Sequence, residues 1–293
     1  MRISLVLATV GRTDELSTAL DSIASQHEQP VEVIVVDQNI DDRLVPIVRR
    51  AREQGLVMRH LHSQPQALSR ARNVGLRAAV GDVVAFPDDD CWYEPTTLAM
   101  VSAAFREHPA CDGLVAQWSE HAAMQTPNSS GSDGQVLSNA RSRAFRDGDA
   151  SSICLFLRRN LLERLGGFDE SLGVGAWFGA AEETDVVLRA LESGALIVRR
   201  PEVVVHHPCQ RQDSPRRISS SEFRRVMIRA RGTGALYAKH KLAPFVIFRG
   251  LARPLLSSLW PFGHRLSWLA AVALVTGRVQ GFVRWRQIGE RRR

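Results

Sequence analysis

The sequence lacks the features that mark a secreted or membrane-spanning protein. Its four cysteines, at positions 91, 111, 154 and 209, have no metal-like or redox-like spacing, so no disulfide framework is expected. The apolar start, Met1 to Val10, is too short for a signal peptide, and no basic region precedes it. No run of about 18 apolar residues occurs, so no membrane-spanning helix is expected. We therefore expect a cytoplasmic protein.

Acidic residues are scarce in the C-terminal segment. From Arg211 onward there are 18 Lys or Arg residues and three acids, a balance of +15. Because the whole chain carries +7, residues 1–210 carry −8. A basic tail on an acidic body indicates that the tail meets an anionic partner, either nucleic acid or anionic lipid.

Short aliphatic runs alternate with helical patterns in the first half of the chain. We expect buried strands at 3–8, 31–36, 57–61 and 83–86, with helices over 14–23, 45–54 and 68–79 between them. This alternation predicts an α/β fold with a doubly wound, mostly parallel sheet. Ligands bind beyond the carboxyl ends of such strands. The candidate site residues there are Thr9, Arg12, Asp37, Asp88, Asp89 and Asp90.

The second half of the chain changes character. Residues 119–150 are rich in Ser, Asn, Gly and Asp and predict a long loop. Strands are expected at 152–157, 195–198 and 203–205, and helices at 161–165 and 184–193. After Pro208 the pattern is helical, basic and amphipathic. We therefore predict a main domain over 1–210, with halves 1–118 and 119–210, and a basic helical extension over 211–293.

The three aspartates Asp88, Asp89 and Asp90 follow the fourth strand directly. Carboxylates this close together repel one another, so the cluster costs stability unless a cation offsets the charge. Mg²⁺ and Mn²⁺ prefer carboxylate oxygen and can bridge to phosphate oxygen. A solvated acidic turn is the alternative, but the position after a central strand favours a divalent-metal site.

Two further groups of polar residues occur in the second half. Glu182 and Glu183 stand at a helix start, where they could serve as a general base for a hydroxyl nucleophile or simply favour the helix dipole. His206 and His207 end an apolar strand, where an imidazole could complete a metal site or have a structural role.

A basic and polar group opens the helix that precedes the acidic strand. It comprises Arg70, Arg72 and Asn73. Arginine beside a helix N-terminus suits diphosphate binding, and a solvated face is the alternative.

Taken together, these features resemble the family 2 glycosyltransferases of the GT-A fold over roughly residues 1–210. The resemblance rests on five stretches in a fixed order. They are Ser4 to Thr9 with Arg12, Val33 to Gln38, Ala71 to Leu76, Phe86 to Asp90, and Gly166 to Glu170 leading to Glu182 to Asp185 and His207.

The resemblance implies a role for each of these residues. A nucleotide-diphosphate donor, most commonly a uridine one, would contact Thr9, Arg12, Asp37, Arg72, Asn73, Asp88 and Asp89. A divalent metal, Mn²⁺ or Mg²⁺, would bind Asp88, Asp90 and His207, with His206 as the alternative ligand. Glu183 falls at the catalytic base, although the family often has Glu-Asp where this chain has Glu182-Glu183, so Glu182 remains open.

The function that follows is inverting transfer of a sugar to a hydroxyl of a polysaccharide or glycolipid precursor. Two other functions are weighed against it. A sugar-nucleotide pyrophosphorylase would need a Gly-rich, Lys-containing loop after the first strand, but Val10 to Thr13 has one glycine and no lysine. A nucleic-acid-binding protein would present a stacking platform, but the tail's aromatics are mixed with aliphatics. We expect the amphipathic tail to bind an anionic membrane surface at the inner face of the cell membrane. Packing of its helices on the main domain or on a second subunit is the alternative.

Overall fold

The computed structural model describes residues 1–119, 136–137, 151–208, 218–259 and 267–291. The chain divides into two compact units. Unit 1 comprises Met1–Ser138, Ala150–Phe168 and Arg189–Cys209, and unit 2 comprises Asn139–Asp149, Asp169–Leu188 and Gln210–Arg293. These units follow contacts in space, so the predicted domain boundary at residue 210 stays a prediction about independent folding.

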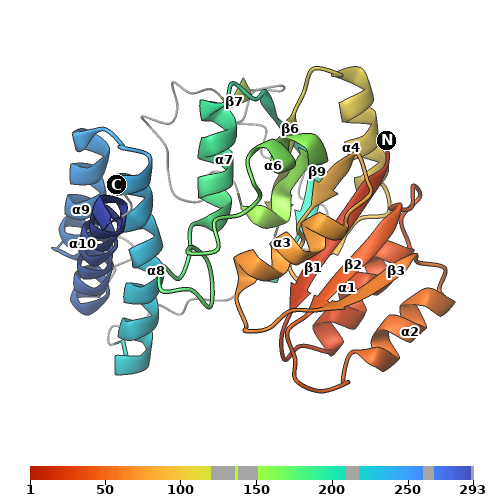
Figure 1. The fold of residues 1–293 in the computed structure, drawn as a ribbon, viewed down its shortest axis with the longest axis horizontal. Helices are drawn as coiled ribbons and strands as arrows, with labels where there is room; N and C mark the ends of the chain where they lie inside the picture. The colour runs from red at the N-terminus through yellow and green to blue at the C-terminus, as the bar shows by residue number, and fades with distance from the viewer. Residues whose placement is uncertain (120–135, 138–150, 209–217, 260–266, 292–293) are drawn as a thin grey trace. The chain divides into compact units, whose positions relative to one another are not determined.

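Unit 1 is built on one sheet with the strand order β3-β2-β1-β4-β8-β6-β9-β5 (Figure 1). In that order the strands are Met58–His62, Glu32–Asp37, Ile3–Thr9, Val83–Ala85, Leu155–Arg158, Gly113–Ser119, Ile197–His206 and Trp92–Tyr93. Strands β1 to β4 are parallel to one another, as are β6 and β9. A short strand β7, Val136–Leu137, pairs with β9. The predicted α/β class is confirmed.

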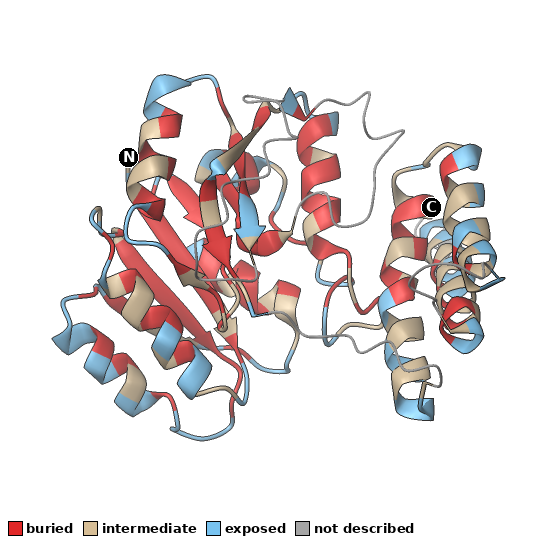
Figure 2. Cartoon of the chain, turned by 180° about the vertical axis from the view of Figure 1, so that it is seen from behind, coloured by how far each residue is buried: buried red, intermediate tan, exposed pale blue. Residues whose placement is uncertain are grey.

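The aliphatic strands form the core of unit 1. Every residue of β2 is buried, and β1 is buried at all but one position (Figure 2). The helices of the first half are α1 (Asp14–Ala24), α2 (Val45–Glu53), α3 (Leu68–Ala78) and α4 (Thr97–Glu107). Helix α3 lies so close to the sheet that a Cβ on Gly75 would collide with Val6. This close approach fixes the helix that carries Arg72 against the strand that ends at Thr9.

The second half differs from the expected pattern in its details. The predicted strand at 152–157 begins with a 3₁₀ turn, Ser152–Cys154, and only then becomes β8. Strand β8 is antiparallel to both of its neighbours. The two strands expected at 195–198 and 203–205 are one strand, β9. Helices α6 (Arg159–Arg164) and α7 (Glu182–Glu192) occur close to their predicted positions, and the predicted loop at 119–150 falls largely outside the described residues.

Unit 2 contains the predicted helical C-terminal part, which is confirmed. Its helices are α8 (Ser220–Lys239), α9 (Pro244–Leu259) and α10 (Trp268–Arg291). Helix α8 begins with a capping box formed by Ser219 and Glu222. None of the described helices has the length and apolar character needed to cross a bilayer.

Glycine allows α8 and α10 to pack backbone against backbone. A Cβ added to Gly234 of α8 would collide with the carbonyl oxygen of Arg278, and one added to Gly281 of α10 would collide with that of Arg231. Gly289, near the end of α10, has open space around it. The helix pair therefore tolerates a side chain at some of its glycines and not at others.

We predict opposite effects on stability for the same substitution at two of these positions. Gly234→Ala should lower the free energy of unfolding by about 1–3 kcal/mol, because the backbone of α10 cannot yield to the new methyl group. Gly289→Ala should raise it by up to about 1 kcal/mol, because alanine is the better helix former and nothing opposes it. Urea unfolding followed by circular dichroism measures both, and effects of the same sign would contradict the close packing.

Candidate donor and metal site

The three aspartates after β4 meet residues that follow β1. Since β1 and β4 are adjacent parallel strands, their carboxyl ends lie side by side. Thr9 Oγ1 donates to Asp89 Oδ2 at 2.6 Å, and Arg12 Nη1 lies 2.5 Å from Asp89 Oδ1. The same Arg12 nitrogen lies 2.6 Å from Asp90 Oδ2. One guanidinium therefore holds two of the three carboxylates together.

The surroundings of Asp89 oppose its ionisation, whereas those of Asp90 favour it. Burial raises the pKa of Asp89, although Thr9 and Arg12 act against this effect. For Asp90, burial also opposes ionisation, but His207 and Arg12 outweigh it and lower the pKa. Asp90 in turn raises the pKa of His207. Of Asp89 and Asp90, Asp90 is thus the carboxylate that ionises more readily.

Asp90 and His207 form the part of the site that fits a divalent cation. Asp90 Oδ1 is buried, accepts no hydrogen bond from the described residues and lies 3.2 Å from His207 Nε2. These two atoms and the thiol of Cys91 lie within 4.8 Å of one another. Burial raises the pKa of the Cys91 thiol, which disfavours the thiolate form that binds metals. One carboxylate and one imidazole remain, and both are suitable ligands for Mn²⁺.

Asp88 lies on the more exposed side of the same turn. Its Oδ1 is 3.1 Å from Nη2 of Arg72, and the same nitrogen donates to Ser152 Oγ at 2.9 Å. The Arg72 guanidinium lies over the Phe168 ring, 5.5 Å from its centre, and its side chain is 2% exposed. Arg72 therefore brings a buried positive charge to the acidic turn. The role of Asp88 as a metal ligand stays a prediction.

Asn73 contacts the backbone of Phe168. Its Nδ2 donates to the Phe168 carbonyl at 2.9 Å, and its Oδ1 accepts from the Phe168 backbone N–H at 2.8 Å. A Cβ on Gly167 would lie 2.5 Å from Asn73 Oδ1. These contacts indicate that Asn73 positions the segment under Arg72. Its predicted contact with the nucleotide stays a prediction.

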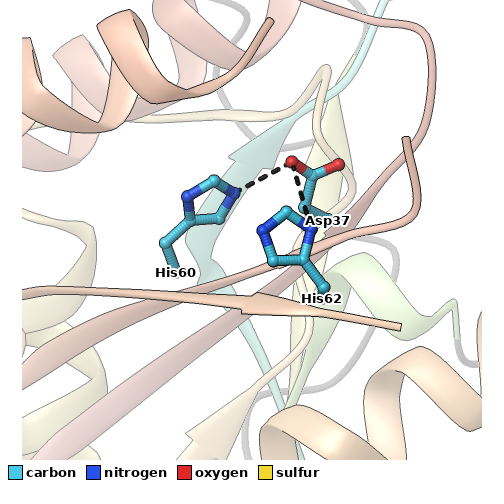
Figure 3. A group of neighbouring side chains, drawn as sticks. All are labelled: Asp37, His60 and His62. Atoms are coloured by element: carbon cyan, nitrogen blue, oxygen red, sulfur yellow. Dashed lines mark hydrogen bonds and ion pairs between the residues drawn. The ribbon is translucent and has the colours of Figure 1, made fainter. Parts of the chain in front are cut away.

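Asp37 ends β2 and is fully buried. Its Oδ1 accepts from the backbone N–H and from Nδ2 of Asn39, both at 2.8 Å. Its Oδ2 lies 2.9 Å from His60 Nε2 and 4.0 Å from His62 Nδ1 (Figure 3). Sequence reasoning missed both histidines, although the pattern of His60 and His62 two residues apart on a strand would have placed them on one face.

The two histidines at the end of β9 have different surroundings. His206 Nε2 lies 3.0 Å from Glu94 Oε1, and its ring stacks on Trp92 with centres 5.3 Å apart. His207 reaches Asp90 instead. His206 is the last residue of β9 and His207 follows it, and consecutive residues of an extended chain point to opposite sides. Of the two candidates, His207 is the one next to the carboxylate cluster.

Glu182 and Glu183 belong to unit 2, at the start of α7. Glu182 is buried, with 5% of its surface exposed. Glu183 is partly exposed and lines a hollow of about 200 Å³ together with Arg229, Thr233 and Arg278. Ala181, directly before the helix, has a φ of +79°, a strained conformation that typically occurs at functional sites.

Asp185 has a structural role that the sequence pattern did not reveal. Its Oδ1 lies 2.7 Å from Lys239 Nζ and 2.9 Å from His240 Nε2, and its side chain is fully buried. These ion pairs tie α7 to the end of α8 within unit 2.

The family model of Glycosyl transferase family 2 matches residues 4–166, more than half of the chain. Among curated proteins, the poly(ribitol-phosphate) beta-N-acetylglucosaminyltransferase TarS of Staphylococcus aureus (strain Mu50) is 30% identical over 111 residues, which is 37% of this chain and 19% of TarS. The chain spans about a third or less of the length of the curated relatives it matches.

Solved structures share the fold over nearly the whole chain. Residues 1–349 of S. aureus TarS in complex with UDP-GlcNAc superpose with a TM-score of 0.60 at 18% identity, covering 98% of this chain and 92% of that one. The mannosyltransferase PcManGT of Pyrobaculum calidifontis, in complex with GDP-Man and Mn²⁺, gives a TM-score of 0.58 at 18% identity, covering 98% and 75%. At such identities the likeness establishes the fold alone, and the GT-A prediction is confirmed. Because the family model matches more than half of the chain, this chain belongs to glycosyl transferase family 2.

Proposed function

We propose that this enzyme moves a sugar from a UDP-sugar to a hydroxyl of a polysaccharide or glycolipid precursor, with inversion and with Mn²⁺ or Mg²⁺ as cofactor. One observation carries the proposal. A buried carboxylate and an imidazole, Asp90 and His207, lie together at the carboxyl edge of a parallel sheet. The UDP-GlcNAc, GDP-Man and Mn²⁺ bound to proteins of the same fold support this class of donor.

The donor half of the mechanism follows from the charges around the acidic turn. A bound divalent ion would supply positive charge for the diphosphate, and Asp90 and His207 would hold it. Arg72, buried beside Asp88, would add a second positive charge. Its attraction for the leaving diphosphate grows as that group gains negative charge. Thr9, Arg12 and Asp37 would hold the nucleotide.

The acceptor half depends on Glu183. Its carboxylate would take the proton of the acceptor hydroxyl as that oxygen bonds to the anomeric carbon and the bond to the diphosphate breaks. The partial exposure of Glu183 in a hollow, against the burial of Glu182, supports this choice between the two. The hollow also contains Arg229 and Arg278, so an acceptor with a phosphate group near the reacting hydroxyl would be favoured.

Removal of the Asp90 carboxylate tests the donor half. We expect Asp90→Ala to abolish transfer and to remove the Mn²⁺-dependent part of UDP binding, because the metal loses a charged ligand. Calorimetric titration of UDP with and without Mn²⁺ measures this. Glu107→Ala, an exposed acid at the end of α4, is the control and should bind as the parent protein does. Unchanged Mn²⁺-dependent affinity in Asp90→Ala would rule out this ligand.

Loss of the base tests the acceptor half separately. Glu183→Gln should lower kcat by roughly 10² or more, the usual contribution of a positioned general base, and leave the calorimetric affinity for UDP unchanged. Glu182→Gln is the matched comparison and should keep most of its turnover. If instead Glu182→Gln shows the large loss and Glu183→Gln does not, the base is Glu182.

We also propose that α9 lies on an anionic membrane surface. Four large side chains on one face of this helix are 64–70% exposed: Phe245, Phe248, Leu256 and Leu259. Their spacing of 3, 8 and 3 residues places them on one stripe. Gly250, which lies off this stripe, packs against Tyr237 of α8, and Arg253 is exposed. Apolar rings with a neighbouring arginine suit a position at the level of the lipid headgroups.

Point substitutions test the membrane proposal without disrupting the helix packing. The double variant Phe245→Ser and Phe248→Ser should reduce co-sedimentation with anionic vesicles by roughly 10-fold or more, because burying one phenylalanine contributes about 1.5–3 kcal/mol. Val57→Ser, which removes an exposed apolar residue in unit 1, should have no effect. If the double variant sediments as the parent does, α9 is not the membrane-binding face.

A further inference from the structure

His60 and His62 converge on the same carboxylate oxygen of Asp37 (Figure 3). The two histidines stand two residues apart on β3, the outermost strand of the sheet, so they share one face. In the pairing of β2 with β3, Asp37 lies opposite His62 and Val35 lies opposite His60. Three groups that can bind a metal are therefore brought together by strand register alone.

The carboxylate is held in one orientation. Asn39 donates two hydrogen bonds to Asp37 Oδ1, which leaves Oδ2 facing the histidines. Oδ2 lies 2.9 Å from His60 Nε2 and 4.0 Å from His62 Nδ1, and all three ligand atoms lie within 4.8 Å of one another. Ligand atoms around a tetrahedral Zn²⁺ with bonds of about 2.0–2.1 Å lie about 3.3 Å apart. The observed distances bracket that value.

We propose that Asp37, His60 and His62 form a second metal site, separate from the acidic turn and selective for Zn²⁺ and similar transition-metal ions. Two imidazoles and one carboxylate suit Zn²⁺ and Co²⁺, whereas Mg²⁺ prefers oxygen ligands. The hydrogen bonds from Asn39 act as the outer shell that fixes a ligand before the metal arrives. The His62 side chain is 60% exposed, so an ion can enter from solvent and keep a water molecule as its fourth ligand.

The site has a consequence for the enzyme if the proposed function is correct. Asp37 is also the residue proposed to hold the nucleotide of the donor, and Zn²⁺ would occupy the Oδ2 atom that faces the histidines. Zn²⁺ at this site and the donor would then compete, although a second metal ion remains free to bind at Asp90 and His207. The enzyme would be inhibited by Zn²⁺ at concentrations that leave its dependence on Mn²⁺ unchanged.

Calorimetric titration of Zn²⁺ into the full chain, prepared without a histidine tag, tests the site itself. The variant Asp90→Ala with His207→Ala should keep this binding event. The single variant His62→Ala and the double variant His60→Ala with His62→Ala should weaken it by at least about tenfold, since even the loss of an outer-shell partner costs about 10–100-fold. The exposed His108 provides the control His108→Ala, which should bind as the parent does.

Visible absorption of bound Co²⁺ gives a second measurement that reports ligands directly. We expect the low-coordinate Co²⁺ bands in the parent and in Asp90→Ala with His207→Ala, and their loss in His62→Ala. The largely exposed side chain of His62 makes this variant the one least disturbing to the fold. Equal Zn²⁺ affinity in His62→Ala and the parent, or loss of binding only with Asp90 and His207, would overturn the proposal.

A third measurement separates this site from the proposed function. UDP affinity at saturating Mn²⁺ should fall when Zn²⁺ is added to the parent, and should not fall in His60→Ala with His62→Ala. Zn²⁺ binding that depends on the histidines but leaves UDP affinity unchanged would overturn the competition and the nucleotide role of Asp37, while the metal site itself would stand.

Discussion

Repulsion between neighbouring carboxylates is the constraint on which the arrangement of unit 1 depends. Three aspartates follow the buried strand β4, and a single basic group could not neutralise all three negative charges. Basic side chains from three different parts of the chain contact them: Arg12 after β1, Arg72 on α3 and His207 after β9. These contacts join the turn to three separate parts of the chain.

Close packing of α3 on the sheet allows a basic side chain to reach the acidic turn. Arg72 can reach the acidic turn because Gly75, one turn further along α3, lets that helix lie almost against β1 and β2. Asn73, on the same helix, holds the backbone of Phe168, whose ring supports the Arg72 guanidinium. A buried arginine of this kind is costly unless its surroundings are fixed, and here close packing fixes them.

Unit 2 also contains a buried carboxylate with basic side chains beside it. Asp185 is fully buried one turn after the start of α7, and Lys239 and His240 at the end of α8 balance its charge. Just before that helix, the Trp177 ring lies between the guanidinium groups of Arg231 and Arg284, at 4.3 Å and 4.2 Å. Two basic residues of the C-terminal helices, Arg231 and Arg284, thus hold the segment that leads to Glu183.

Local patterns in the sequence were sufficient for much of the fold and for the identity of the acidic turn. Aliphatic runs of strand length, helical periodicity and polar residues at strand ends depend on neighbouring residues only, so β1 to β4, α1 to α3 and the residues Thr9, Arg12, Asp37 and Asp88 to Asp90 could be predicted. The family resemblance added Glu183 as the expected base and His207 as the expected metal ligand to the same set.

Pairing over long distances could be decided only by the tertiary structure. The antiparallel direction of β8, the merging of two expected strands into β9 and the ion pair of Asp185 with Lys239 all join residues far apart in the chain, and no local pattern encodes such a contact. The convergence of His60 and His62 on Asp37 has the same origin. Each residue alone is an ordinary strand residue, and it is the register of β2 against β3 that brings two imidazoles to one buried carboxylate.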